Sequence, residues 1–447
     1  MKLTRRRFLQ MGAAGTGVAA LNLSAFPALA SNLASCDGGY KAIVGIDLAG
    51  GNDGYNMLVP TESSAYTQYQ TLRDYLAIDK SSTIPLNSES NPTELAMHPA
   101  MEALEPYWKD GQLAAILNVG TLTEKVTASN YSDLTRPSHL FSHSHQSQMI
   151  QSHCTQQLSK EGFGALAAIV LGASEINAPM YDMGGLQIWT NCLQAQSNSV
   201  GSSLPKDMFN NDISRDLYQK LQNSQAYSSP FERHYTNLAQ NALEDYDLYK
   251  GIFETNTGTS FPDTKIGEQL EAVFKMILNR EQFQQPAQYF SCKIGGFDTH
   301  NNQAETQERL LGEVAQAMAA FQNALNVHGL SHHVTTFTHS DFGRTLIPNG
   351  TKGTDHGWAS HSLIMGGDVI GKKFYGEYPD LSPQSPYLIS RARVIPTLST
   401  DQVHASLLAW LGLSNTAINT LFPALNPNSG SGITPATLPL FRSCLNQ

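Results

Sequence analysis

Carboxylate and imidazole side chains lie close together in the sequence at two places. Asp298 and His300 are two residues apart in a glycine-flanked segment, and Asp355 is followed directly by His356. Residues two apart in an extended chain face the same side, so Asp298 and His300 could bind one cation together. Carboxylate oxygen and neutral imidazole nitrogen are ligands that zinc prefers. All four residues are therefore candidate metal ligands, and the alternative is a hydrogen-bonded pair without a metal.

Two more carboxylates follow apolar runs of the sequence. Asp53 lies in a glycine-rich turn at residues 50–56, and Asp341 comes shortly after the apolar run 334–338. Glycines allow a close backbone approach that would present Asp53 as a ligand, but a plain Asn-Asp-Gly turn is the simpler alternative. Arg344 could hold a phosphate, sulfate or carboxylate through two parallel hydrogen bonds, or form an internal ion pair with an aspartate. We count Asp53 and Asp341 as further candidate ligands and Arg344 as a candidate catalytic residue.

Residues 140–148 combine serine hydroxyls and imidazoles ahead of a predicted helix. A serine at the start of a helix either caps it or acts as a nucleophile, and the helix dipole favours an anionic group there. Ser142 is the candidate nucleophile if a nearby metal lowers the pKa of its hydroxyl. A metal-bound water is the alternative nucleophile, and His143 is a further candidate catalytic residue.

Apolar runs that end near glycine alternate with stretches of helical periodicity, which is typical of β-α-β units around a parallel sheet. The predicted strands are 42–48, 113–119, 287–294, 334–338 and 362–365. The predicted helices are 99–109, 231–249, 266–280, 305–327 and 402–411. Open parallel sheets bind ligands outside the carboxyl ends of their strands, where Asp53, Asp298 and Asp341 would lie. The sequence therefore predicts an α/β fold with a mainly parallel central sheet and the candidate site at one of its edges.

The chain opens with a twin-arginine export signal. Thr4-Arg5-Arg6-Arg7-Phe8-Leu9 precedes an apolar run at 11–23 and a small-residue cleavage site at Ala28-Leu29-Ala30. The run is shorter than the roughly 20 residues of a membrane-spanning helix. We therefore expect residues 1–30 to be removed after passage through the twin-arginine translocase, which carries folded proteins and suits a protein that binds its metal before export. A lipoprotein anchor at Cys36 is the alternative.

The mature protein is expected to be soluble, to have no membrane span and to work in the periplasm or outside the cell. We expect residues 31–447 to form one domain, in which the polar segment 194–264 is an insertion or a cap over the site. The whole chain has 28 Lys and Arg against 38 Asp and Glu, and loss of residues 1–30 leaves a net charge of −14. This charge argues against nucleic acid as a partner.

Several familiar motifs are absent from the sequence. Its five cysteines lack the C-x-x-C spacing of zinc and redox motifs. In an oxidising compartment these cysteines could form one or two disulfides. It contains no G-x-S-x-G, G-x-G-x-x-G or H-E-x-x-H motif. A redox role therefore has weak support.

Five motifs together resemble the domain of unknown function 1501 family. They are the glycine-rich turn at 50–56, Leu-Phe-Ser-His at 140–143, Gly-Gly-Phe-Asp-Thr-His at 295–300, Ser-Asp-Phe-Gly-Arg-Thr at 340–345 and Gly-Thr-Asp-His-Gly at 353–357. At the level of the fold, this family is similar to the alkaline phosphatase and sulfatase superfamily. The resemblance implies a three-layer α/β/α fold whose metal site and oxygen nucleophile cleave phosphate or sulfate esters.

The resemblance also implies roles for individual residues. Ser142 stands at the nucleophile position, and the metal ligands match Asp53, Asp298, His300, Asp341 and His356. Phe342 departs from the pattern, because metal-binding relatives commonly have a histidine there, and this leaves one metal, a different metal or a degenerate site. We expect a divalent metal, with zinc ahead of manganese and calcium, and a small-molecule or polymer ester as substrate. A non-catalytic exported protein that binds or assembles with a partner is the alternative function.

Overall fold

The computed structural model describes residues 39–442, apart from 89–93, 135, 155–157, 174–177, 196, 205–206 and 208. The predicted export signal at residues 1–30 lies outside the described residues, as do Cys36 and Cys444. The other three cysteines, Cys154, Cys192 and Cys292, are buried and free. None of the expected disulfides is therefore found within the described part of the chain.

A sheet of nine strands forms the centre of the described structure, in the order β11-β5-β10-β9-β1-β8-β6-β7 with β14 beside β5. The strands are β1 (Lys41–Leu48), β5 (Leu113–Gly120), β6 (Met180–Asp182), β7 (Asn198–Ser199), β8 (Ala287–Ile294), β9 (Val334–His339), β10 (Ser360–Gly366), β11 (Phe374–Tyr375) and β14 (Leu398–Ser399). β1 pairs in parallel with both β8 and β9. β10 is antiparallel to both of its neighbours, β9 and β5. The sheet is therefore mainly parallel, as predicted.

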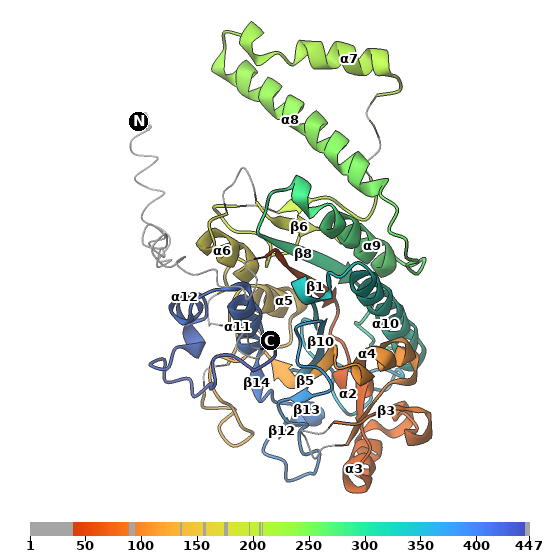
Figure 1. The fold of residues 1–447 in the computed structure, drawn as a ribbon. Coiled ribbons are helices and arrows are strands. Elements are labelled where there is room, and N and C mark those ends of the chain that lie inside the picture. Colours follow the sequence, from red (N-terminus) through yellow and green to blue (C-terminus); the bar gives the residue numbers. More distant parts are fainter. Residues whose placement is uncertain are drawn as a thin grey trace.

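Helices cover both faces of this sheet (Figure 1). The main ones are α6 (Phe163–Val170), α9 (Lys265–Leu278), α10 (Gln303–Val327), α11 (Thr400–Leu411) and α12 (Asn415–Leu421). Ala42, Val44 and Ile46 of β1 pack into one hydrophobic core with α9 and α10. Ile43 packs into a second core, with α6, α11 and α12. Alternate side chains of one strand thus enter cores on opposite faces, which confirms the predicted three-layer α/β/α fold.

The residues that flank α11 set its ends. The Ser399 hydroxyl accepts a hydrogen bond from the backbone N–H of Asp401, and the side chain of Gln402 accepts one from the backbone N–H of Ser399. This capping box satisfies N–H groups that the first turn of a helix leaves unpaired. Gly412 ends the helix with a φ of 107°, a left-handed conformation that glycine adopts without strain. The cap explains why α11 begins two residues before its predicted start.

The predicted helix 99–109 is divided into two parts. Pro99–Leu104 forms a 3-10 helix, and α4 (Glu105–Lys109) follows it. Pro106 has no N–H group, so it cannot donate the hydrogen bond that would continue one helix through this point. The other predicted helices and strands begin and end within four residues of their expected bounds.

The described residues form further α-helices and strands beside the central sheet and its main helices. They are α2 (Gly54–Met57), β2 (Leu58–Pro60), α3 (Ser63–Arg73), β3 (Ile84–Leu86), β4 (Leu95–Met97), α5 (His143–Gln151), α7 (Asp212–Leu221), α8 (Pro230–Phe253), β12 (Leu388–Ile389) and β13 (Arg393–Val394). β2, β4 and β3 form a small separate sheet, and β12 pairs with β13. Each helix in the described residues is too short or too polar to cross a membrane.

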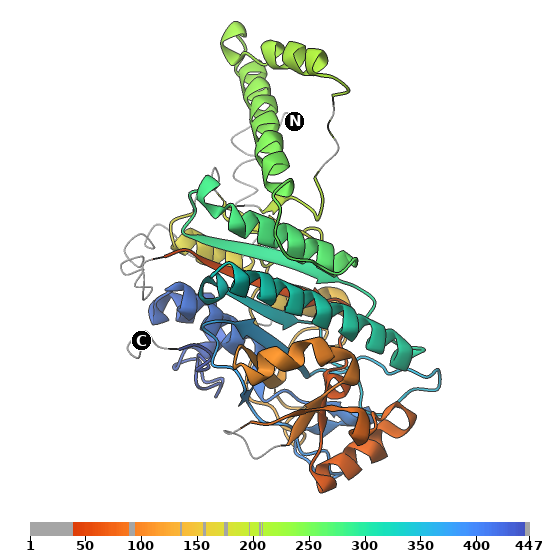
Figure 2. The ribbon, with the colours of Figure 1, turned by 45° about the vertical axis from the view of Figure 1, so that its right-hand side comes forward.

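α7 and α8 form an arm that stands out from the edge of the sheet, and both views show it extending away from the layers (Figures 1 and 2). The arm lies within the segment 194–264, for which we predicted an insertion or a cap. The contacts of α7 and α8 that the structure describes include an ion pair between Arg215 and Asp247, which joins the two helices. We refer to these two helices as the α7–α8 arm.

Candidate metal centre

Parallel strands bring several predicted ligands to one edge of the sheet. β1 ends at Leu48, which lies opposite Ile294 at the end of β8, and β9 ends beside them. The turn after β1 passes close to the segment after β8, because a Cβ atom on Gly50 would lie 2.4 Å from the backbone nitrogen of Asp298. Gly50 also has a φ of 117°, so glycine is required at this position. This edge is the one at which such sheets bind ligands.

Three residues from distant parts of the chain form a group that could hold one metal ion. His143 begins α5, Asp298 follows β8, and His356 lies before β10; one ligand atom of each lies within 4.8 Å of the others. His143 Nε2 is 3.1 Å from His356 Nε2 and 3.5 Å from Asp298 Oδ2. His300 adjoins the group, because its Nε2 is 3.0 Å from His356 Nε2 and 3.1 Å from Asp298 Oδ1. We call these four residues the His/Asp cluster.

In His356 and His143, the Nδ1 atom, which points away from the cluster, lies within hydrogen-bond distance of an oxygen atom. His356 Nδ1 is 2.8 Å from the carbonyl oxygen of Phe141, which can only accept, so this nitrogen carries the proton. His143 Nδ1 is 2.7 Å from Asp341 Oδ2. The hydrogen bond to Asp341 raises the pKa of His143, whereas burial lowers the pKa of His356. A proton on Nδ1 leaves the Nε2 lone pair directed into the cluster, as is typical of histidines that bind metals.

His300 has a similar contact on its outer side. Its Nδ1 lies 3.2 Å from Asp355 Oδ1, and the other oxygen of Asp355 lies 2.6 Å from Arg391 Nη2. Burial alone would raise the pKa of Asp355, but a hydrogen bond from Asn349 and the charge of Arg391 outweigh it and lower the pKa. Asp355 and Asp341, both predicted as ligands, thus contact the cluster through the outer nitrogens of histidine rings.

Arg344 is fully buried beside the cluster. Its Nη2 donates to Asp298 Oδ1 at 2.6 Å and to the carbonyl oxygen of Phe297 at 2.9 Å, and its Nε donates to the carbonyl oxygen of Gly51 at 3.0 Å. Partial burial would raise the pKa of Asp298, but the hydrogen bond and charge of Arg344 outweigh this effect and lower the pKa. Arg344 therefore keeps Asp298 ionised. Of the two roles that the sequence allowed for Arg344, the structure shows the internal ion pair with an aspartate.

Asp53 lies in a separate buried group. It forms an ion pair with Arg73 at the end of α3, and the side chain of Gln303 donates to the same carboxylate oxygen. Gln307 donates to the backbone carbonyl of Asp53 at 2.7 Å. The described contacts of the Asp53 carboxylate thus go to Arg73 and to Gln303 of α10, and the cluster is formed by other residues. Arg73 could not be singled out from the sequence, because a single basic residue in the last turn of a helix is common.

Ser142 immediately precedes α5, but its side chain does not cap the helix. Its Oγ lies 2.8 Å from His145 Nδ1 and 3.3 Å from Ser144 Oγ. The neighbouring His143 points its ring into the cluster instead. The two adjacent candidates therefore have different partners, and His145, which the sequence analysis did not single out, is the imidazole in contact with Ser142.

Phe342 forms an apolar wall of the cluster. The centre of its ring lies 4.7 Å from the ring centres of both His143 and His356. The ring also fills the space beside the turn after β1, since a Cβ atom on Gly51 would lie 2.6 Å from it. At the position where the family resemblance led us to expect a histidine in a metal-binding protein, this chain thus has a packed, nearly fully buried aromatic side chain.

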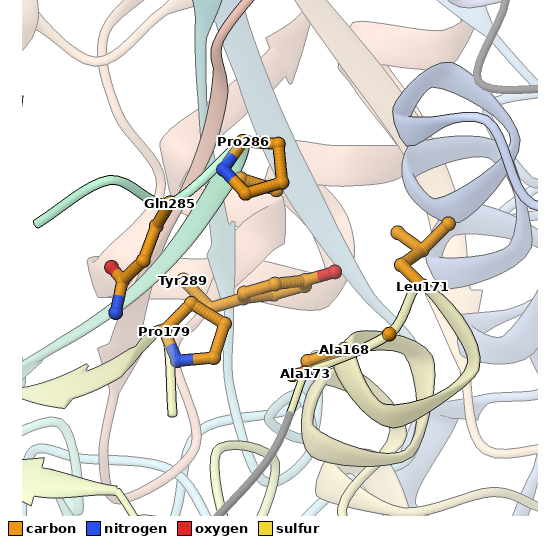
Figure 3. Close-up of a pocket in the computed structure, with 9 residues that line it drawn as sticks. Ala168, Leu171, Ala173, Pro179, Gln285, Pro286 and Tyr289 are labelled. Atoms are coloured by element: carbon orange, nitrogen blue, oxygen red, sulfur yellow. The ribbon is translucent and has the colours of Figure 1, made fainter. Parts of the chain in front are cut away.

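A cavity of about 130 Å³ lies at the other end of the sheet (Figure 3). It is lined mainly by small and apolar residues, including Pro179 before β6 and Ala287 at the start of β8. Tyr289 contributes a buried hydroxyl that has no hydrogen-bond partner among the described residues. Because β8 begins at this cavity and ends near the His/Asp cluster, the cavity is distinct from the candidate metal centre.

The chain belongs to a family described as "Protein of unknown function (DUF1501)", which matches residues 40–420. This result confirms the family resemblance inferred from the sequence motifs. No match was found among curated proteins.

Solved structures with a weak similarity include the C-terminal periplasmic domain of EptC from Escherichia coli in complex with Zn, at 10% identity and a TM-score of 0.34, covering 87% of each chain. The PsFucS1 sulfatase from Pseudoalteromonas sp. has 11% identity and a TM-score of 0.34, covering 88% of this chain and 71% of the sulfatase. The phosphonate monoester hydrolase SpPMH from Silicibacter pomeroyi has 9% identity and a TM-score of 0.31, covering 84% and 74%. These similarities are too low to carry a functional argument, which must come from the site itself.

Proposed function

We propose that this protein is an exported, metal-dependent hydrolase of phosphate or sulfate esters. The observation that carries the proposal is the arrangement of the three cluster histidines. Each has an acceptor at Nδ1, and each Nε2 faces the Asp298 carboxylate or another Nε2. Imidazole nitrogen with one carboxylate suits zinc, whereas manganese and calcium favour a larger share of oxygen ligands. Zinc is therefore the metal we expect first.

The residues in and around the cluster would have distinct roles in binding the metal and orienting its ligands. His143, Asp298 and His356 would hold the metal, with His300 beside them, and Asp341 and Asp355 would fix the orientation of their rings. When bound, the metal would supply positive charge to polarise the ester and to stabilise the developing negative charge. Arg344 adds a second fixed positive charge behind Asp298.

Ser142 remains our candidate nucleophile. Support comes from the 2.8 Å contact between its Oγ and His145 Nδ1, because an imidazole at this distance can accept the hydroxyl proton. Ser142→Ala should then lower kcat for an aryl phosphate or aryl sulfate by at least roughly 100-fold. Ser132→Ala is the matched control, since Ser132 is an exposed serine outside this group of contacts and should be close to wild type. Equal activity of both variants would exclude Ser142 and favour water as the nucleophile.

The place of action follows from the sequence rather than from the described residues. The signal at residues 1–30 supports export by the twin-arginine translocase, and the substrate would then be an ester outside the cytoplasm. The ester group could belong to a small molecule or to a polymer.

A non-catalytic binding protein is the second candidate. Two ion pairs favour it: Arg73 neutralises Asp53, and Arg344 neutralises Asp298, so both carboxylates have a charge partner within the chain. Hydrolysis assays separate the candidates. Purified protein, treated with a chelator and then supplied with zinc, manganese or calcium, should regain hydrolysis of aryl phosphate or aryl sulfate with one of these ions if the enzyme proposal is correct. Absence of hydrolysis with every ion would support the binding protein.

A further inference from the structure

The outer part of α8 carries an apolar stripe that faces solvent. Phe231, Tyr235, Leu238 and Ala242 recur every three or four residues, so they lie on one face of the helix. Phe231 is 87% exposed, Tyr235 65% and Leu238 54%, and Ala242 is exposed as well. The stripe extends over about 16 Å along the helix axis.

α7 carries a second stripe of the same kind. Ile213, Leu217 and Leu221 recur every four residues and are 80%, 62% and 58% exposed. None of the ten residues of α7 is buried. Arg215 connects the helix to α8 by its ion pair with Asp247, at 2.5 Å. A helix this short is marginal in water without apolar packing, so a partner that covered the exposed apolar stripe would stabilise α7.

The two stripes together expose more apolar surface than a monomer usually does. Monomeric proteins rarely leave contiguous apolar patches larger than a few hundred Å² in solvent. Six large apolar side chains, each more than half exposed, approach the roughly 800 Å² that each partner buries in a stable complex. This area is of the order that each partner buries in a standard-size protein–protein interface.

We propose that the α7–α8 arm is a dimerisation element, through which two copies of this chain pair about a twofold axis. Two arms bring together four helices, and in a four-helix bundle each stripe can pack against another. A twofold interface uses the same surface on both copies and closes on itself, so no apolar stripe remains exposed. The arm stands out from the layers, and two arms can therefore meet while the bodies stay apart (Figures 1 and 2).

The charges of the arm favour a second copy over a membrane surface. Residues 212–253 contain six acidic and four basic side chains, whereas helices that lie on membranes are rich in Lys and Arg. Both signs occur next to the stripes: Asp216 and Lys220 of α7, which form an ion pair with each other but stay exposed, and Glu232 and Arg233 of α8. Each arm can thus offer positive and negative partners to an identical arm.

The test is the mass of the full protein in solution, measured by light scattering over a wide range of concentration. The wild type should have twice the mass of one chain and dissociate on dilution. Phe231→Glu/Leu238→Glu should weaken the dimer at least roughly 30-fold, because charges would enter its apolar core. Asn237→Glu adds one such charge on another exposed face of α8 and should leave the dimer intact.

The variants must also keep their helical content, as measured by circular dichroism, so that loss of the dimer is separated from unfolding. Leu217→Glu provides an independent change on α7 with the same expected result. A wild-type monomer at all concentrations would overturn the proposal, whether or not the protein bound anionic lipid vesicles. A dimer that both stripe variants leave unchanged would overturn it as well. Neither outcome depends on the metal centre.

Discussion

At the scale of single residues, the contact between Asp341 and His143 determines which nitrogen of the imidazole is free. Asp341 is buried at the end of β9, and its carboxylate holds Nδ1 of His143 at 2.7 Å. Nε2 is then the nitrogen available to a metal. Asp341 is a positioning residue in this account, because it acts through His143.

Asp341→Asn should weaken metal binding by about 10- to 100-fold, the usual effect of losing such a partner. The asparagine could still contact the ring but would no longer favour the proton on Nδ1, and the pKa of His143 would fall towards its ordinary value. Competition with a chelator measures the affinity, and titration of the metal-free protein by NMR measures the pKa. Asp110→Asn, at an exposed position elsewhere, is the control. Wild-type affinity in Asp341→Asn would contradict this role.

The candidate residues were predictable in part. The pairs Asp298 and His300, and Asp355 and His356, are visible in the sequence because their members are close in the chain. The acceptors for the outer nitrogens are not visible in this way. His356 depends on the carbonyl of Phe141, which lies 215 residues away, and any residue type supplies a carbonyl. Such a contact exists only after the chain has folded.

At the scale of secondary structure elements, β1 ends in an unusual buried carboxylate. Asp47 is 2% exposed, and its Oδ2 accepts no hydrogen bond from the described residues, although Lys293 Nζ is 3.6 Å away. Burial, assisted by the charge of Asp341, raises the pKa of Asp47 to about 7. The folded protein therefore binds this proton more tightly than the unfolded chain, in which an aspartate titrates near 3.9.

Because the pKa of Asp47 is raised on folding, its contribution to stability is present below about pH 4 and is lost as the pH rises through about 7. Asp47→Asn should therefore be more stable than the wild type at pH 8, on the order of 1–3 kcal/mol, and nearly equal to it at pH 4. Urea unfolding at several pH values measures the difference, with the exposed Asp380→Asn as control. A difference that does not change with pH would contradict the assignment.

The cap of α11 leads to a prediction about the C-terminal layer. Ser399→Ala removes the hydroxyl that accepts from the N–H of Asp401 and should lower the free energy of unfolding by about 1–2 kcal/mol. Ser390→Ala, at an exposed serine, should change it by less than about 0.5 kcal/mol. Chemical denaturation measures both values. Equal stability of the two variants would show that the cap contributes little.

The long elements were predictable because their apolar patterns are strong, and five strands and most helices were placed correctly from the sequence. Strands of two or three residues, such as β7, β11 and β14, are too short to show a pattern. The antiparallel direction of β10 could not be predicted either, since its sequence does not reveal which strands it pairs with. Pairing depends on the whole fold rather than on the strand alone.

At the scale of the whole molecule, the sheet explains how residues more than 200 positions apart form one cluster. β1 places its turn beside the segment after β8, and α5 brings His143 from the first half of the chain to His356. The arm lies apart from this cluster, so the candidate metal centre at the edge of the sheet and the proposed interaction surface on α7 and α8 are separate parts of the molecule.

The most direct test of the central claim is the metal content of the full protein purified without chelators from a host that exports it. Elemental analysis should find close to one zinc or other divalent ion per wild-type chain, and almost none in His143→Ala/His356→Ala. His234→Ala, which removes an exposed imidazole from the arm, should keep the wild-type content. A folded wild type that binds no divalent ion even when zinc, manganese or calcium is supplied, or a double variant with unchanged content, would contradict the account.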